Sequence, residues 1–375
     1  MGTEERLREA LSRRVSGVET DEGAWESIQA RLERRPRRRA VQVRVVAVVA
    51  AGVTAAALAV LWLALRHEPP APGPASVPVL SPQVTAVIPV GPWPGVIAVG
   101  DGSAWVAVRS DSGEPALVRI DEATNEVVDR IPVDVRDVVV AFGSVWASGL
   151  SSSGGPAVLR IDPATDQIVA TIEGVGGYLA AGEGAVWALT PAEGESVLSR
   201  IDPTTNDAVP LVTVSGPPVG LGAGEGAVWL SDRSPRAGLV LAKVDPVTGS
   251  VTDRIDLDFY SLAVGEGYVW LGRLDPQGST VVVRIDPRTD APIEPSIQWG
   301  GAFRPFDVGE GGIWIIEGPP GGICRLNTET LRDDSCVDPG GYADTGLNWP
   351  AALDTTTGTI WVANYQDTVT RIDLP

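Results

Sequence analysis

The stretch GEGAVWALTPAEGESVLSRIDPTTNDAVPLV, residues 182–212, is one copy of a pattern that fills most of the chain. A Gly-x-Gly turn leads into a Trp, a polar loop follows, and an Arg-Ile-Asp-Pro-x-Thr segment leads into a run rich in Val and Ile. Seven copies are present, with Trp spacings of 41, 41, 42, 41, 44 and 47 residues. Their Trp residues are Trp105, Trp146, Trp187, Trp229, Trp270, Trp314 and Trp361. A period of this length indicates a repeat architecture.

Each copy holds about four short strands. The Gly-x-Gly element supplies positive φ angles for one hairpin, and the Asp-Pro-x-Thr segment suits a second. Four strands per copy predict an all-β, seven-bladed β-propeller over residues 83–375. The last copy stops at RIDLP, residues 371–375, one strand short, while a strand-like VTAVIPV lies at 84–90. We therefore expect residues 84–90 to complete the last blade and close the ring, which protects the strand edges.

The copies resemble those of YVTN-type and virginiamycin B lyase-type bacterial propellers, over about residues 83–375. The lyase resemblance implies an enzyme that opens a cyclic depsipeptide by elimination, with a His base and a magnesium-binding carboxylate on one face of the propeller. The only His of this chain is His67, outside the repeats. The sequence therefore favours a protein that is not an enzyme, with no cofactor and no metal, and leaves the lyase as an alternative.

The repeat Trp residues are expected to pack between blades, the alternative being that they stack on a ligand. The repeated Asp of the Ile-Asp-Pro segments is expected to cap a turn rather than to bind calcium, because no DxDxDG loop accompanies it. Those residues are Asp162, Asp202, Asp245 and Asp286.

A candidate binding rim follows from counting back from each repeat Trp. In propellers of this kind, the loop before the first strand of each blade opens onto the face around the central channel. Here these loops hold aromatic and Arg side chains, where a simple turn needs Gly, Pro or Asn. Such side chains stack on sugars or dock a peptide; the alternative is that they plug the channel mouth. The predicted rim is Trp93, Arg136, Tyr178, Tyr260, Arg304 and Trp349.

The two Cys residues, Cys324 and Cys336, fall on the expected third and fourth strands of the sixth copy. These strands pair across a short hairpin, so outside the cytoplasm a disulfide is the natural expectation, with free buried thiols as the alternative.

The chain before the repeats has a membrane-anchor pattern. Residues 45–65 are uncharged and apolar, and as a helix they are long enough to cross a bilayer. Six Arg residues precede them from position 34 onward, which predicts a single pass with the N-terminus inside. Residues 66–82 are Pro-rich, which predicts a stiff, extended spacer. A cleaved signal peptide is the alternative, but 44 residues precede the apolar run.

Residues 1–44 predict two short helices with an Arg cluster, too short for a core of their own. They resemble the heads of actinobacterial membrane-bound anti-sigma factors, which implies a transmembrane regulator as a further alternative. One Lys beside 28 Arg is typical of high-GC, actinobacterial coding.

Charge is divided along the chain. Residues 1–44 carry a net charge of +3 and residues 81–375 a net charge of −22. An acidic body repels phosphates, so nucleic acid is not expected as a partner. The sequence thus predicts a membrane-tethered, extracytoplasmic module that binds, senses or scaffolds a cell-envelope glycan, peptide or protein. It does not predict the oligomeric state.

Overall fold

The computed structural model describes residues 82–109, 114–234, 238–277, 279–299, 306–309, 311–316, 322–329, 333–337, 350–356, 358–364 and 367–374. They belong to the compact unit Pro78–Pro375. The predicted head (1–44) and span (45–65), and the Pro-rich spacer up to residue 81, lie outside the described residues. In the part of the chain that is described, no helix is long and apolar enough to cross a membrane.

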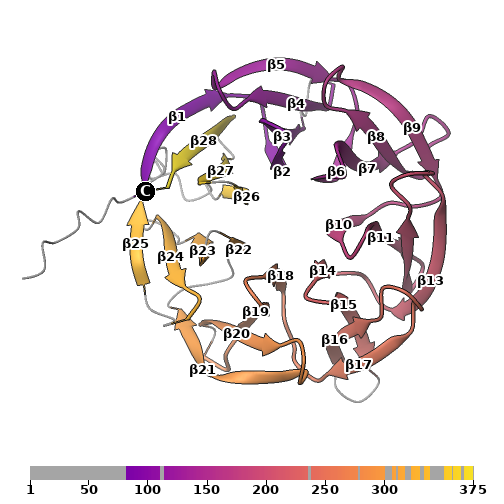
Figure 1. Ribbon diagram of the computed structural model, residues 1–375, viewed down its shortest axis with the longest axis vertical. Helices are drawn as coiled ribbons and strands as arrows, with labels where there is room; N and C mark the ends of the chain where they lie inside the picture. Colours follow the sequence, from indigo (N-terminus) through magenta and orange to yellow (C-terminus); the bar gives the residue numbers. More distant parts are fainter. Residues whose placement is uncertain are drawn as a thin grey trace, which may run out of the picture. The chain divides into compact units, whose positions relative to one another are not determined.

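Seven antiparallel sheets of four strands each form the fold, and each sheet is one blade of a β-propeller (Figure 1). Blade 1 holds β2 (Pro94–Gly100), β3 (Ser103–Val108), β4 (Ala116–Asp121) and β5 (Glu126–Ile131). Blade 2 holds β6 (Val135–Ala141), β7 (Ser144–Leu150), β8 (Pro156–Asp162) and β9 (Gln167–Glu173). Blade 3 holds β10 (Tyr178–Gly182), β11 (Ala185–Ala192), β12 (Glu195–Ile201) and β13 (Ala208–Ser215). Blade 4 holds β14 (Leu221–Gly224), β15 (Ala227–Ser234), β16 (Gly238–Val244) and β17 (Val251–Ile255).

The other three blades follow the same order. Blade 5 holds β18 (Ser261–Gly265), β19 (Tyr268–Leu274), β20 (Thr280–Asp286) and β21 (Ala291–Trp299). Blade 6 holds β22 (Phe306–Gly309), β23 (Gly312–Ile316), β24 (Ile323–Asn327) and β25 (Asp333–Val337). Blade 7 holds β26 (Pro350–Thr356), β27 (Thr359–Asn364), β28 (Thr368–Asp373) and β1 (Gln83–Pro89). The first strand of each blade is innermost and contacts the first strands of both neighbouring blades, all the way round the ring.

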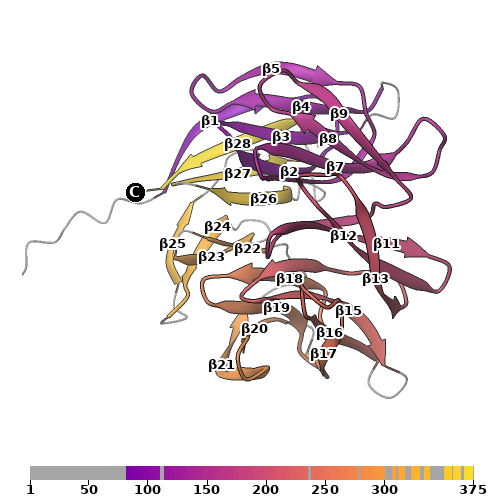
Figure 2. The ribbon, with the colours of Figure 1, turned by 45° about the vertical axis from the view of Figure 1, so that its right-hand side comes forward.

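The ring closes through β1, which pairs antiparallel with β28 from Gln83 opposite Asp373 to Pro89 opposite Thr368. Both views show β1 beside β28 (Figures 1 and 2). Just after β1, the N–H of Val90 donates to the carbonyl of Asp367 at 2.8 Å. Ile88 and Val90 are buried in one cluster with residues of blades 1 and 7. The start of the propeller therefore supplies the outer strand that its C-terminal end lacks.

The repeat Trp residues lie on the second strand of each blade, and all seven are buried, none more than 1% exposed. No ring face is left for a ligand. In five blades the indole N–H donates to the carbonyl five residues earlier, as from Trp187 to Gly182 at 2.9 Å. The indoles thus fill the blade core and satisfy the turn carbonyl beside them.

Opposite each Trp, on the third strand, lies the basic residue of the Arg-Ile-Asp segment. In six blades its charge lies over the indole ring, 5.0–5.9 Å from the centroid. The same cation often reaches the Asp-Pro turn of the next blade: Lys243 donates to Asp290 at 2.7 Å, and Arg119 to Asp166 at 3.0 Å. Arg371 of blade 7 donates to Asn125 of blade 1 at 3.0 Å, so this contact also spans the point of closure.

The Gly-Glu-Gly turns add a second link between blades. The Glu has a positive φ angle, as in Glu183 at 51°, and its carboxylate accepts the N–H of the glycine in the next blade's turn. Gly226 donates to Glu183, Gly267 to Glu225 and Gly311 to Glu266, at 2.9–3.0 Å. The Glu of the Gly-Glu-Gly motif therefore accepts a hydrogen bond from the next blade.

The repeated Asp residues cap turns, as expected. Asp202 accepts the N–H groups of Thr204 and Thr205, and Asp245 accepts those of Val247 and Thr248. These bonds lower the pKa of both carboxyl groups. Among the described residues, no three His, Cys, Asp or Glu side chains are grouped to hold a metal ion.

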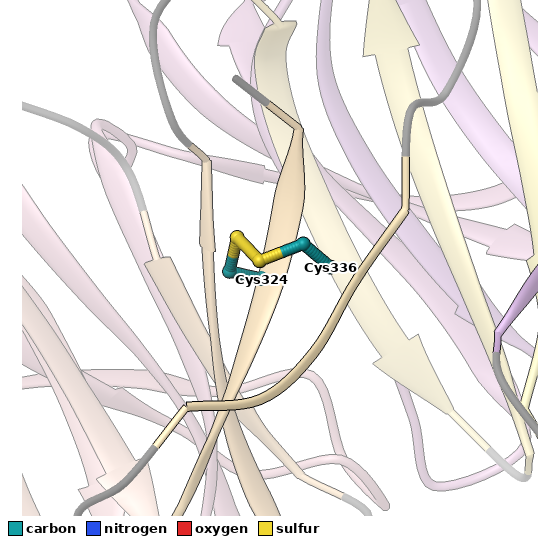
Figure 3. The surroundings of a disulfide bond; sticks show 2 residues. All are labelled: Cys324 and Cys336. Atoms are coloured by element: carbon teal, nitrogen blue, oxygen red, sulfur yellow. A yellow bond between two sulfur atoms is a disulfide. The ribbon is translucent and has the colours of Figure 1, made fainter. Parts of the chain in front are cut away.

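The disulfide expected from the sequence is present. Cys324 of β24 and Cys336 of β25 are directly opposite each other and bonded (Figure 3). Cys324 is buried and Cys336 is exposed, so the bond joins the core of blade 6 to its outer strand.

Candidate binding pocket

One pocket of about 650 Å³ opens where the first strands of blades 1, 2 and 3 begin and their second strands end. We call it the top-face pocket. Antiparallel pairing brings these strand ends to the same edge of each blade, so residues about 40 positions apart in sequence meet there. It is lined by Val96, Arg109, Asp134, Arg136, Asp137, Gly177, Tyr178 and Pro191.

A β-bulge places Arg136 in this pocket. Val135 pairs with Gly149 and Asp137 pairs with Ser148, so Arg136 is an extra residue without a pairing partner in β7. A bulge re-aims the side chain that it carries. Arg136 is exposed, and its guanidinium makes no hydrogen bond or ion pair with the residues that the structure describes. It is thus available to a ligand.

Arg109 approaches the pocket from the end of β3. Its backbone N–H donates to the carbonyl of Trp93 at 3.3 Å, which ties the end of β3 to the start of β2. Its side chain is exposed and, like that of Arg136, has no ion-pair partner within the described ranges. Two guanidinium groups therefore line one pocket of a strongly acidic body, and such groups favour carboxylate or phosphate ligands.

Asp137 links blade 2 to blade 3 at the pocket wall. Its Oδ2 accepts the N–H of Leu179 at 2.7 Å, and its Oδ1 accepts the N–H of Val138 at 2.9 Å. Burial nevertheless raises the pKa of Asp137 to about 7, because the desolvation of its charge outweighs the two N–H groups. The carboxyl group therefore changes charge near neutral pH.

Tyr178 occupies in blade 3 the position that Asp137 occupies in blade 2, since each is paired with the residue two positions after the repeat Trp. Tyr178 is 41% exposed. Burial, and then the charge of Asp137, raise the pKa of the phenol. Tyr178 is thus a neutral hydroxyl donor with a partly exposed aromatic face at the pocket.

Gly177 forms the wall before Tyr178, with a φ of +82°. A Cβ here would lie 2.4 Å from the carbonyl oxygen of Leu189. Its own carbonyl accepts the hydroxyl of Ser148 at 2.6 Å. Only glycine fits, and its carbonyl ties the pocket wall of blade 3 to β7 of blade 2.

Of the six predicted rim residues, the structure brings Arg136 and Tyr178 into one pocket. Trp93 is 52% exposed and touches Arg109 through its backbone, but it is not among the described lining residues. Tyr260 lies before β18 in blade 5, where its hydroxyl donates to Thr280 at 2.9 Å. Arg304 and Trp349 lie outside the described residues.

Counting back from Trp found Arg136 and Tyr178 but missed Arg109, Asp134 and Asp137. Arg109 and Pro191 each lie four residues after a repeat Trp, so counting forward as well would have found both.

The comparisons with known proteins bear on the fold. No family model and no curated relative matches the sequence. A catalytically inactive virginiamycin B lyase from Staphylococcus aureus with quinupristin is 13% identical, with a TM-score of 0.53 over 77% of this chain and 99% of that chain. The selenomethionine-substituted lyase from the same organism is 14% identical, with a TM-score of 0.52 over the same shares.

The WD40 domain of coronin from Toxoplasma gondii is 10% identical, with a TM-score of 0.55 over 78% of this chain and 87% of that chain. An enzyme and a WD40 domain are thus both similar to this chain. Identities this low show the fold alone, because unrelated functions share this architecture.

Proposed function

We propose that the propeller is a non-catalytic binding module that takes its ligand in the top-face pocket. The observation that carries this proposal is the pair Arg109 and Arg136, which line one pocket without an ion-pair partner among the described residues. In the described lining, neither Arg forms an ion pair with Asp134 or Asp137, so both guanidinium groups keep N–H donors for an anion. The pocket volume lies within the range of about 300–1,000 Å³ that is usual for ligand sites.

We further propose that the module is tethered outside the cytoplasm. The support is in the sequence: the apolar run 45–65, the Arg residues before it and the Pro-rich spacer 66–82. The disulfide between Cys324 and Cys336 agrees with an oxidising compartment. The ligand of such a module is a cell-envelope glycan, peptide or protein.

Two other readings carry less support. The lyase resemblance implies a His residue as the general base. Residues 68–375 of this chain contain no His. Asp137, whose pKa is about 7, could serve as a base, but among the described residues no three His, Cys, Asp or Glu side chains are grouped to hold the magnesium ion that the lyase resemblance implies. Signalling through residues 1–44 in the manner of an anti-sigma factor stays a prediction from the sequence.

The test is a binding assay on the full-length protein in detergent. The panel contains peptidoglycan disaccharides with and without a stem peptide. We expect one class to bind, and Arg136→Ala to weaken its binding at least about tenfold, because a charged hydrogen bond contributes about 1.5–3 kcal/mol. Arg130→Ala, an exposed Arg on the outer strand β5, is the matched control. Full affinity in Arg136→Ala, or no binding by any member, would contradict the proposal.

A further inference from the structure

The side chains of the top-face pocket narrow the class of ligand. Beside the charged groups, the described lining offers Val96, Pro191 and the ring of Tyr178. It contains no Ser, Thr, Asn or Gln side chain. A sugar carries hydroxyl groups on most of its surface, and those that face Val96 and Pro191 rather than the charged groups would be buried without partners, which is costly. A peptide with small apolar side chains places methyl groups against Val96 and Pro191 at no such cost.

The charges point to one end of that peptide. Arg109 follows β3 of blade 1 and Arg136 lies on β6 of blade 2, and both line this pocket. Guanidinium groups bind carboxylates through paired N–H donors. Asp134, also on the lining, is an acceptor for a peptide N–H. The lining thus suits the C-terminal end of a peptide, where the free carboxylate lies next to the amide N–H of the last residue.

We propose that the top-face pocket binds the C-terminal carboxylate of a short peptide between Arg109 and Arg136. This inference rests on the proposed function, because it names the ligand class of the same pocket. The titratable and charged groups that line the pocket with Asp137 are Arg109 just after β3, Asp134 just before β6, Arg136 on β6, and Tyr178 on β10.

Asp137 makes the binding pH-dependent. An ionised Asp137 repels a carboxylate in the same pocket, whereas the acid form does not. With a pKa of about 7, the acid fraction falls from about nine-tenths at pH 6 to about one-tenth at pH 8. If only the acid form binds, the apparent affinity falls about tenfold over this interval, and binding above pH 7 takes up a proton.

The experiment titrates the full-length protein in detergent with three probes: N-acetyl-alanyl-alanine, its C-terminal amide, and glucuronate. The free acid should bind at least about tenfold more tightly than the amide at pH 6, since the amide has no charge for the two Arg residues. Arg109→Ala should remove most of this preference. Arg130→Ala should leave it unchanged.

The pH effect is measured without a variant, by calorimetry of the free acid at pH 7.5 in two buffers with different ionisation enthalpies. Uptake of a substantial fraction of one proton per peptide is expected. Asp137→Asn, where it folds, should bind with little change between pH 6 and pH 8.

The outcomes separate this inference from the proposed function. Equal binding of acid and amide, or tighter binding of glucuronate, would overturn the peptide carboxylate while leaving a binding pocket in place. Binding without proton uptake would overturn the role of Asp137. Failure of all three probes together with the peptidoglycan panel would remove both proposals.

Discussion

Replacing Trp229 with alanine is expected to lower the free energy of unfolding by about 3–5 kcal/mol, the range for truncating a large buried aromatic side chain. The side chain is fully buried, its indole N–H donates to the carbonyl of Gly224 at 3.2 Å, and Lys243 lies 5.1 Å from the ring centroid. The alanine variant has a cavity in place of the ring. The carbonyl of Gly224 loses its indole donor, and Lys243 loses its contact with the aromatic ring. Denaturant unfolding of the full-length protein, followed by circular dichroism, measures the loss.

The matched control for Trp229 is Val247→Ala in the same blade. Val247 lies in the turn between β16 and β17 and is 88% exposed. A change within about 0.5 kcal/mol is expected there. Equal midpoints for Trp229→Ala and wild type would show that the repeat Trp does not hold the blade together.

Ile88→Asn is expected to destabilise the propeller by about 4 kcal/mol, whereas the same change at the neighbouring Val87 should cost no more than about 1 kcal/mol. Ile88 is 5% exposed and packs between blades 7 and 1; Val87 is 53% exposed on the other face of β1. At position 88 the substitution removes apolar burial and places an amide among apolar groups. Ile and Val are both strong strand formers, so the difference between the two variants mainly reports the closing contact.

Thermal unfolding of the two variants, under the same conditions, gives this comparison. Equal destabilisation by Ile88→Asn and Val87→Asn would mean that β1 does not bury one face against the ring.

The period of the Trp residues was enough to predict the propeller and its number of blades. A blade cannot bury its two faces alone, so seven regular copies dictate seven stacked sheets. The strand missing after Asp373 and the strand-like residues 84–90 together predicted the closure that β1 and β28 show. The disulfide followed from the same reasoning, because Cys324 and Cys336 fell on strands that had to be paired.

The contacts between blades were harder to predict, because they depend on strand register. The Arg-Ile-Asp segment was visible as a repeat, yet nothing in one copy shows that Arg119 faces Trp105 and reaches Asp166 of the next blade. Similarly, Glu183 appeared to be a turn residue, and its bond to Gly226 arises only once the two turns are adjacent.

The pocket was predicted only in part. Arg136 and Tyr178 were identified as members of a rim, but the bulge that lets Arg136 face a ligand depends on the pairing of Val135 and Asp137 with β7. The raised pKa of Asp137 is a consequence of burial, which no single copy of the repeat reveals. A pocket shared by three blades arises only once those blades lie next to one another.

The closed ring requires that residue 83 lies beside residue 373, and a disulfide between these positions tests this directly. Gln83 and Asp373 are opposite each other in the pairing of β1 with β28, and opposed Cα atoms lie about 4.5–5.5 Å apart, within reach of a disulfide. In the variant Gln83→Cys with Asp373→Cys, mass spectrometry after proteolysis should find an intramolecular 83–373 disulfide in most molecules. The pair Gln83→Cys with Val247→Cys should give none. If the 83–373 bond fails to form in folded protein under oxidising conditions, or forms only between molecules, the ring does not close as described.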